Sequence, residues 1–177
     1  DRLTREGAVT YPTDAPDQPG HDVVFDKGFP RPGGFGRLVA AKINPPAETP
    51  DADFPMILTT GRQLEHWHTG AMTRRASALD ALEPGAVACL SRGTIAGLGI
   101  EPGDPVRVST RRGTIELTAR QDDAVPDGVV FIPFAFVEAA ANLLTNPALD
   151  PFGKIPEFKF CAAKVERTKQ LTGVAAE

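Results

Sequence analysis

The residues best suited to chemistry gather in one segment, 59–75, which holds the single Trp, two of the three His and three Arg. The segment follows an apolar run over 54–58 that is typical of a buried strand. A glycine at the strand end, Gly61, lets the backbone approach a ligand, and Arg62 offers a planar fork to phosphate oxygens. Turns rarely combine Trp, Met and two His. The segment therefore predicts a binding site for a phosphate-bearing ligand.

Short apolar runs punctuated by Gly and Pro must position this segment. Their spacing is typical of an all-β barrel with minor helices, which is the fold class we predict. The predicted strands cover 55–60, 86–90, 105–110, 113–121, 128–134 and 158–166, with short helices at 76–82, 91–98 and 136–144.

Local signals sharpen two of these elements. Ser91 is a candidate N-cap and Gly99 a candidate C-terminal stop for the helix between them. The Gly103-Asp104 loop leads into an alternating strand, and the next strand returns after Gly113, which predicts a hairpin.

Residues 1–53 differ from the rest because they lack periodicity and are rich in turn-forming Pro and Gly. One short strand is expected at 35–40, followed by an extended Pro-rich linker. We interpret 1–53 as an irregular arm from a preceding domain, 54–167 as the barrel and 168–177 as a tail. The start at Asp1, without Met, favours a piece of a longer protein.

Composition narrows the function classes. The net charge of −4 and pI of about 5.4 argue against nucleic acid as the main partner. No apolar run approaches the roughly 18 residues that a membrane span needs. Cys89 and Cys161 lie in apolar runs and are expected to be buried free thiols, too few for an iron–sulfur cluster with its roughly four thiolates.

Three stretches resemble one family. The run Thr60-Gly61-Arg62-Gln63-Leu64-Glu65-His66-Trp67-His68-Thr69-Gly70-Ala71-Met72-Thr73 is the first, and 141–151 and 156–162 follow it in the same order. Together they resemble the C-terminal domain of molybdopterin oxidoreductases, most of all the formate dehydrogenase large subunit. The resemblance implies a six-stranded double-psi β-barrel that binds a molybdopterin guanine dinucleotide carrying molybdenum or tungsten. Periplasmic or assimilatory nitrate reductase is the alternative.

The resemblance implies that the dinucleotide is lined by thirteen residues of this chain. They are Thr60, Gly61, Arg62, Glu65, His66, Trp67, His68, Thr69, Met72, Thr73, Phe134, Asn142 and Lys159. It assigns no catalytic residue and no metal ligand here, because the metal ligand and an iron–sulfur cluster are expected upstream. The implied reaction of the whole enzyme is the two-electron oxidation of formate to carbon dioxide.

Each assignment has a structural alternative. His66 and His68 could be hydrogen-bonded loop residues or two ligands of a metal, with His21 as the remaining His. Trp67 could be a core aromatic, and Lys159 could lie on the wet face of an edge strand.

The remaining polar residues also have two interpretations. Asn142 could be a helix cap, and Asp150 could accept from a guanine or serve in a turn. Arg74-Arg75 could be solvated or contact another domain, and Arg111-Arg112 is expected to serve turn solubility.

The expected partners are upstream domains of the same subunit, electron-transfer subunits and formate, in the cytoplasm or, as the alternative, the periplasm. Two function classes compete with this interpretation. One is a stand-alone barrel for protein recognition, and the other is a small metallohydrolase built on His66 and His68.

Overall fold

The computed structural model describes residues 1–169 and divides the chain into two compact units, Asp1–Asn44 and a second unit that begins at Pro45. Residues 170–177, most of the predicted tail, lie outside the described residues. The linker residues 45–53, which the sequence assigned to the arm, thus group with the barrel.

The first unit contains turns and one short helix, α1 (Arg2–Glu6), which is capped by the Asp1 side chain. The strand predicted at 35–40 is wrong: these residues have no regular structure, and Leu38 is fully exposed. An isolated extended segment has no neighbouring strand to accept its backbone hydrogen bonds, so apolar composition alone does not make it a strand.

The second unit is built on a closed six-stranded barrel, which confirms the predicted fold class. Its strands follow each other in space as β1-β5-β2-β4-β3-β6. The bounds are β1 (Met56–Gly61), β2 (Val87–Leu90), β3 (Pro105–Ser109), β4 (Thr114–Gln121), β5 (Val129–Pro133) and β6 (Cys161–Arg167). Closure removes the exposed edges that would otherwise invite aggregation.

Two strand pairs, β1 with β5 and β2 with β4, run parallel, and the other four are antiparallel, as expected for a double-psi barrel. The predicted hairpin is β3–β4. Its lead-in loop is tied to β4, because the Gly103 N–H donates to the Ala119 carbonyl at 2.8 Å and the Ala119 N–H donates to Asp104 at 2.8 Å. Gly103 has φ 96°, a conformation that side-chain-bearing residues rarely adopt.

The barrel interior is filled by alternating apolar side chains. Val106 and Val108 of β3 are completely buried, while Arg107 between them is exposed. Leu58, Leu90 and other strand residues complete the core. This period-two burial is what sheet geometry requires, because successive side chains point to opposite faces.

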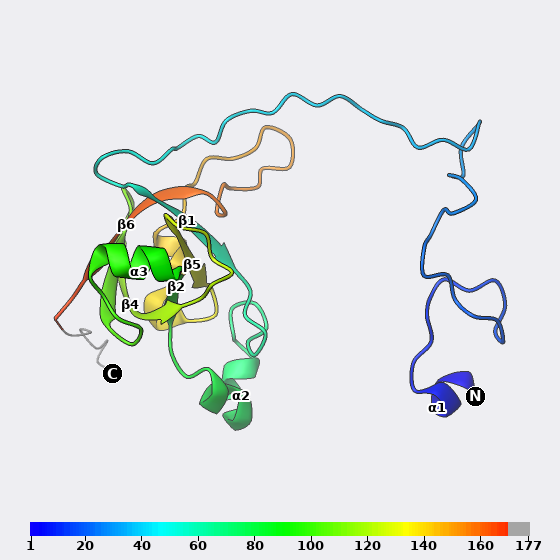
Figure 1. Ribbon diagram of the computed structural model, residues 1–177, viewed down its shortest axis with the longest axis horizontal. Coiled ribbons are helices and arrows are strands. Elements are labelled where there is room, and N and C mark those ends of the chain that lie inside the picture. Colours follow the sequence, from blue (N-terminus) through cyan, green and yellow to red (C-terminus); the bar gives the residue numbers. More distant parts are fainter. Residues whose placement is uncertain (170–177) are drawn as a thin grey trace. The chain divides into compact units, whose positions relative to one another are not determined.

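Short helices connect the strands. They are η1 (Thr73–Arg75), α2 (Ser77–Leu82), α3 (Arg92–Leu98), η2 (Val137–Ala139) and η3 (Ala141–Leu143). In Figure 1, α3 lies against the outside of the barrel, and α2 lies below the barrel in this view. The predicted ends of α3 are confirmed: the Ser91 side chain accepts from the Thr94 N–H, and Gly99 is left-handed at φ 64°.

The segment predicted as one helix at 136–144 is instead two 3-10 turns separated by Ala140, which is extended at ψ 109°. Ala139 and Ala141, on either side, are both buried. Residues two apart face the same side only where the backbone is extended, so a continuous helix would remove one of them from the core.

Both cysteines are free and buried, as predicted. Burial raises the pKa of the Cys89 thiol to about 11 and also raises the pKa of Cys161. Within residues 1–169, no helix is long and apolar enough to cross a bilayer.

Candidate cofactor-binding site

A cavity of about 560 Å³ opens where β1 and β5 end. These strands are parallel, with Thr60 opposite Ile132 and Gly61 opposite Pro133, so their carboxyl ends deliver Thr60 and Phe134 to the same edge. The lining residues are Thr60, Thr69, Phe134, Asn142, Thr145, Asn146, Pro147, Pro156 and Phe158. A cavity of this size suits a small heterocyclic ligand.

Hydrogen bonds fix the walls of this cavity. The buried Thr60 hydroxyl donates to the Phe158 carbonyl at 2.9 Å, and the Phe134 N–H donates to the Gly61 carbonyl at 3.2 Å. A Cβ on Gly61 would collide with the Phe131 ring, so a larger residue at this position would force that ring to move. The two aromatic walls, Phe134 and Phe158, are therefore both tied to the end of β1.

Lys159 does not sit in the alternating strand that the sequence predicted, because β6 begins only at Cys161. Its ammonium donates to the Thr60 carbonyl at 2.6 Å and lies 5.4 Å from the centre of the Phe158 ring. Both neighbours line the cavity, so the cation is placed at the cavity rim rather than on an edge strand.

The loop after β1 is anchored by His66, which is 1% exposed. Its Nε2 donates to the Glu83 carbonyl at 2.7 Å, since a carbonyl can only accept, and its Nδ1 lies 3.3 Å from the Thr73 hydroxyl. That hydroxyl accepts the Trp67 N–H at 3.0 Å, so its own proton is available for Nδ1. Both ring nitrogens are thus satisfied by the protein itself, which favours the interpretation of His66 as a residue that holds the loop.

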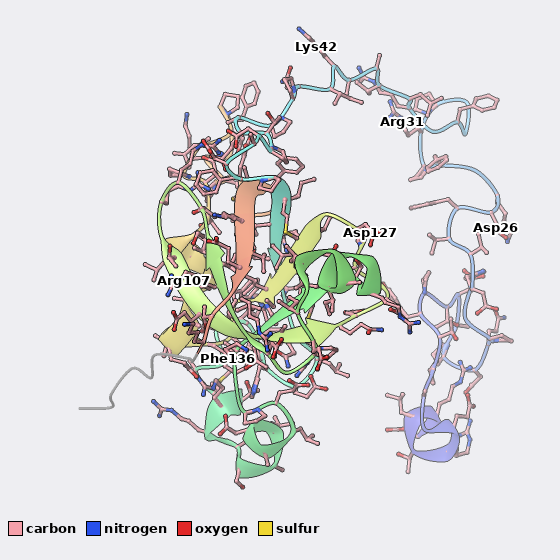
Figure 2. The ribbon with its side chains drawn as sticks, turned by 60° about the vertical axis from the view of Figure 1, so that its left-hand side comes forward. Asp26, Arg31, Lys42, Arg107, Asp127 and Phe136 are labelled. Carbon is pink, nitrogen blue, oxygen red and sulfur yellow. The ribbon has the colours of Figure 1, made fainter. Side chains whose placement is uncertain are left out.

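A second anchor of the same loop involves Phe136, labelled in Figure 2. The His66 ring meets Phe136 edge-on at 5.5 Å, and the Arg74 guanidinium lies over its ring at 4.8 Å. Arg74 also pairs with Glu138 at 2.6 Å and Asp80 at 3.4 Å. Arg74 is therefore neither fully solvated nor free to contact another domain, because it forms ion pairs within the barrel unit.

Three aromatic rings connect the surface of the loop with the cavity. Trp67 is 60% exposed, so it is not a core aromatic. Its ring meets His68 at 4.6 Å, and His68 in turn lies 6.3 Å from Phe134 of the cavity. Arg62 and Met72 are exposed nearby in sequence, and Glu65 is half-buried.

The opposite wall comes from residues 142–147. Asn142 is exposed at the cavity, while Asn146 is buried. The Asn146 backbone N–H donates to the Cys161 sulfur at 3.0 Å, and its side-chain oxygen accepts from the Ala148 N–H at 3.0 Å. The wall is therefore held from behind by β6.

The structure favours one of the two interpretations of Asp150. Both oxygens of Asp150 accept from its own loop, namely the N–H groups of Phe152, Gly153 and Ile155, which favours the turn role. These bonds lower the pKa of Asp150, the bond from Ile155 most of all.

The solubility role expected for Arg111-Arg112 is wrong. Both guanidinium groups pair with Glu48, and Arg111 also pairs with Asp51. The hairpin tip that carries the two arginines therefore holds the linker against the barrel.

Four of the thirteen predicted residues line the main cavity: Thr60, Thr69, Phe134 and Asn142. Gly61 and Lys159 contact its walls, His66 and Thr73 hold the loop, and the others are distributed along the loop. The structure adds Thr145, Asn146, Pro147, Pro156 and Phe158. The polar Thr-Asn pair directly before Pro147 was the available sequence signal, but it is equally typical of an ordinary turn.

The lining suits a flat, polar and neutral ring system. Two Phe rings supply apolar faces, while Thr and Asn side chains supply hydroxyl and amide groups that both donate and accept. None of the lining residues is charged, and the cation of Lys159 stands beside the wall. These donors fit a pterin or a guanine better than a bare phosphate.

Metal binding by the loop is not supported. Within the described residues, no three His, Cys, Asp or Glu side chains are grouped so that they could hold a metal ion. His66, the better placed of the suggested ligands, uses both nitrogens in hydrogen bonds.

A closed barrel with an aromatic and amide-lined cavity at the strand ends is a fold that can hold a planar, polar cofactor. Residues 56–162 match the family model described as "Molydopterin dinucleotide binding domain". The chain belongs to this family. The match confirms both the family predicted from the sequence and the molybdopterin dinucleotide as its cofactor.

Curated relatives are similar over almost the whole chain. The α subunit of F420-dependent formate dehydrogenase 1 from Methanococcus maripaludis is 42% identical over 94% of this chain and 25% of its own length. The corresponding subunit from Methanocaldococcus jannaschii is 42% identical over 94% of this chain and 24% of its length. A periplasmic nitrate reductase from Desulfovibrio desulfuricans is 32% identical over 94% of this chain and 24% of its length. The chain thus spans about a quarter of these relatives.

Among solved structures, acetylene hydratase from Pelobacter acetylenicus superimposes with a TM-score of 0.60 at 23% identity. The match covers 66% of this chain and 19% of the other. At this identity the likeness supports the fold alone.

Proposed function

We propose that this chain is the dinucleotide-holding domain of a formate dehydrogenase α subunit that uses a molybdenum or tungsten bis-pterin guanine dinucleotide. The observation that carries the proposal is the 42% identity to two formate dehydrogenase α subunits over 94% of the chain. The nitrate reductase relative reaches only 32% over the same share.

The reaction of the whole enzyme would convert formate to carbon dioxide, releasing one proton and two electrons. The bound metal–pterin group supplies the redox chemistry. This chain's own residues bind and orient that group, and none is assigned a catalytic role. The remaining part of the subunit, absent from this chain, would provide the metal ligand and the route for electrons.

The cavity residues divide the binding work by chemistry. Phe134 and Phe158 would cover the faces of a planar ring, and Asn142 and Asn146 would meet its donor and acceptor edges. Lys159 at the rim would neutralise phosphate charge.

The loop after β1 would extend this site. Arg62 would share the phosphate charge with Lys159, and Trp67 and His68 would continue the aromatic surface away from the cavity. Thr60, Gly61, Glu65, His66, Thr69, Met72 and Thr73 complete the proposed lining and its support.

The site assignment is tested by cofactor retention in the full-length subunit. Asn142→Ala and Lys159→Ala should each lower the bound pterin and metal per protein about tenfold, since each removes a polar contact worth about 1.5 kcal/mol. Arg107→Ala is the matched control, because Figure 2 shows Arg107 on the outside of the barrel. Full pterin and metal occupancy in both site variants would refute the assignment.

The choice of substrate needs a separate assay. The full-length subunit, purified with its cofactor, should transfer electrons from formate to a viologen dye and should not reduce nitrate. Nitrate reduction without formate oxidation would favour the nitrate reductase alternative. Failure to bind any pterin would favour the stand-alone binding barrel.

Partners and compartment follow from the same proposal. We infer contacts with the other domains of the subunit and with electron-transfer subunits, and a cytoplasmic location. Fractionation of the source cells tests the location, and enzyme released with the periplasmic fraction would contradict it.

A further inference from the structure

The carboxylate of Glu48, in the linker before β1, is 12% exposed and satisfied on both oxygens. One oxygen accepts the Ala162 N–H at 2.6 Å and an Arg112 N–H at 3.0 Å. The other accepts from Arg112 and forms an ion pair with Arg111 at 3.2 Å. We call Glu48, Arg111 and Arg112 the linker latch.

One path leads from the latch to the cavity wall through Arg112. Its Nε donates to the Leu144 carbonyl at 3.1 Å, and the Thr110 hydroxyl donates to the same carbonyl at 2.9 Å. Leu144 is completely buried and directly precedes Thr145, a residue of the cavity lining. The two terminal nitrogens of Arg112 thus bind Glu48, while its Nε binds the backbone of the wall.

A second path leads through β6. Ala162, whose N–H is held by Glu48, follows Cys161, and the Cys161 sulfur accepts the Asn146 N–H at 3.0 Å. The Asn146 side chain also approaches Glu157 at 3.5 Å, and Glu157 accepts the Ala47 N–H at 2.9 Å. Linker residues 47 and 48 therefore connect to Asn146 from two directions.

The electrostatics keep these bonds formed at neutral pH. The hydrogen bond from Arg112 lowers the pKa of Glu48, and the bond to Glu48 raises the pKa of Arg112. Both groups are thus charged and paired, and hydrogen bonds between charged partners are stronger than neutral ones.

We propose that Glu48 is a positioning residue for the cofactor cavity: it sets the place of Thr145 and Asn146 through Arg112 and β6. Because residues 45–51 lead from the first unit into the barrel, the latch also couples the wall of the cavity to the linker. This role of Glu48 rests on the proposed function, because it takes the cavity as the dinucleotide site.

Residue-resolved hydrogen exchange of the 177-residue chain tests the positioning without any cofactor. Glu48→Gln keeps the shape but removes the charge, so the hydrogen-bonded amides of Leu144 and Asn146 should exchange about tenfold faster, while β2 and β4 amides keep their rates. The matched control is Arg107→Gln, which breaks the 2.9 Å pair with Glu116 elsewhere on the barrel. It should leave the wall amides unchanged.

Two outcomes would overturn the proposal. Unchanged exchange at Leu144 and Asn146 would show that the latch does not hold the wall, and an equal increase across all strands would show a purely structural role. Arg112→Lys separates the paths: a lysine can pair with Glu48 but lacks the donor to Leu144. It should accelerate the Leu144 amide more than the Asn146 amide.

A binding measurement distinguishes this inference from the proposed function. With guanosine monophosphate as the probe, the wild-type chain should bind, and Glu48→Gln should bind about tenfold more weakly. Equal affinity of the two chains would overturn the positioning role. Absence of binding by the wild type would count against the proposed function, and the exchange rates alone would then decide the role of Glu48.

Discussion

At the scale of single residues, the site depends on side chains that hold other side chains. His66 contacts Thr73, Glu83 and Phe136 rather than the cavity, and Lys159 is fixed by the Thr60 carbonyl. Residue types alone mark these positions as chemically active. Whether they touch a ligand or support its neighbours depends on burial, which the sequence pattern does not resolve for a loop.

His66 gives a direct prediction at this scale. His66→Ala removes a fully buried ring and leaves the Glu83 carbonyl without its donor, so the free energy of unfolding should fall by about 2–4 kcal/mol. His68→Ala is the control: its ring is half-buried, and the loss should stay below about 1 kcal/mol. Urea denaturation measures both, and equal stability of the two variants would contradict the loop-holding role.

At the scale of elements, α3 shows how local chemistry defines a helix. Gly97 lies within the helix, where an added Cβ would meet open space, whereas Gly99 ends it at φ 64°. Gly97→Ala should therefore stabilise the fold by about 0.5–1 kcal/mol, and Gly99→Ala should destabilise it by about 1 kcal/mol. Thermal unfolding of the two variants checks this, and shifts of the same sign would show that the helix end is assigned wrongly.

The elements also show what the sequence could predict. Alternation and caps identify β3, β4 and α3, because their determinants lie within a few residues. The two turns at 137–143 and the late start of β6 depend on packing against distant residues, as does the pairing of Arg111 and Arg112 with the linker. The motif after β1 indicated where the cavity opens. The far wall of the cavity, at 145–158, could not be assigned from the sequence, because only the fold brings these residues to the end of β1.

At the scale of the whole molecule, four carboxylates link stability to pH. The pKa values of Glu48, Glu83, Asp51 and Asp150 are all lowered, the first two mainly by hydrogen bonds from Arg112 and Arg120. Groups whose pKa is lowered on folding stabilise the protein above their unfolded pKa, which is 4.5 for Glu. This stabilisation is lost as the pH falls through the folded pKa.

The free energy of unfolding should therefore change little between pH 7 and about pH 5, and should fall as the pH drops below the unfolded pKa values of 4.5 for Glu and 3.8 for Asp. Glu48→Gln should flatten part of that fall, because the substituted side chain no longer titrates. Urea midpoints measured across this range provide the check. Stability that rises on acidification would contradict the assigned ion pairs.

The central claim is that the cavity at the ends of β1 and β5 holds the molybdopterin dinucleotide. A structure of the full-length subunit with its cofactor tests this most directly. We expect part of the dinucleotide to lie between Phe134 and Phe158, with Asn142 and Asn146 at its polar edge and the Lys159 ammonium towards a phosphate. A dinucleotide bound elsewhere, with protein side chains filling the cavity, would contradict it.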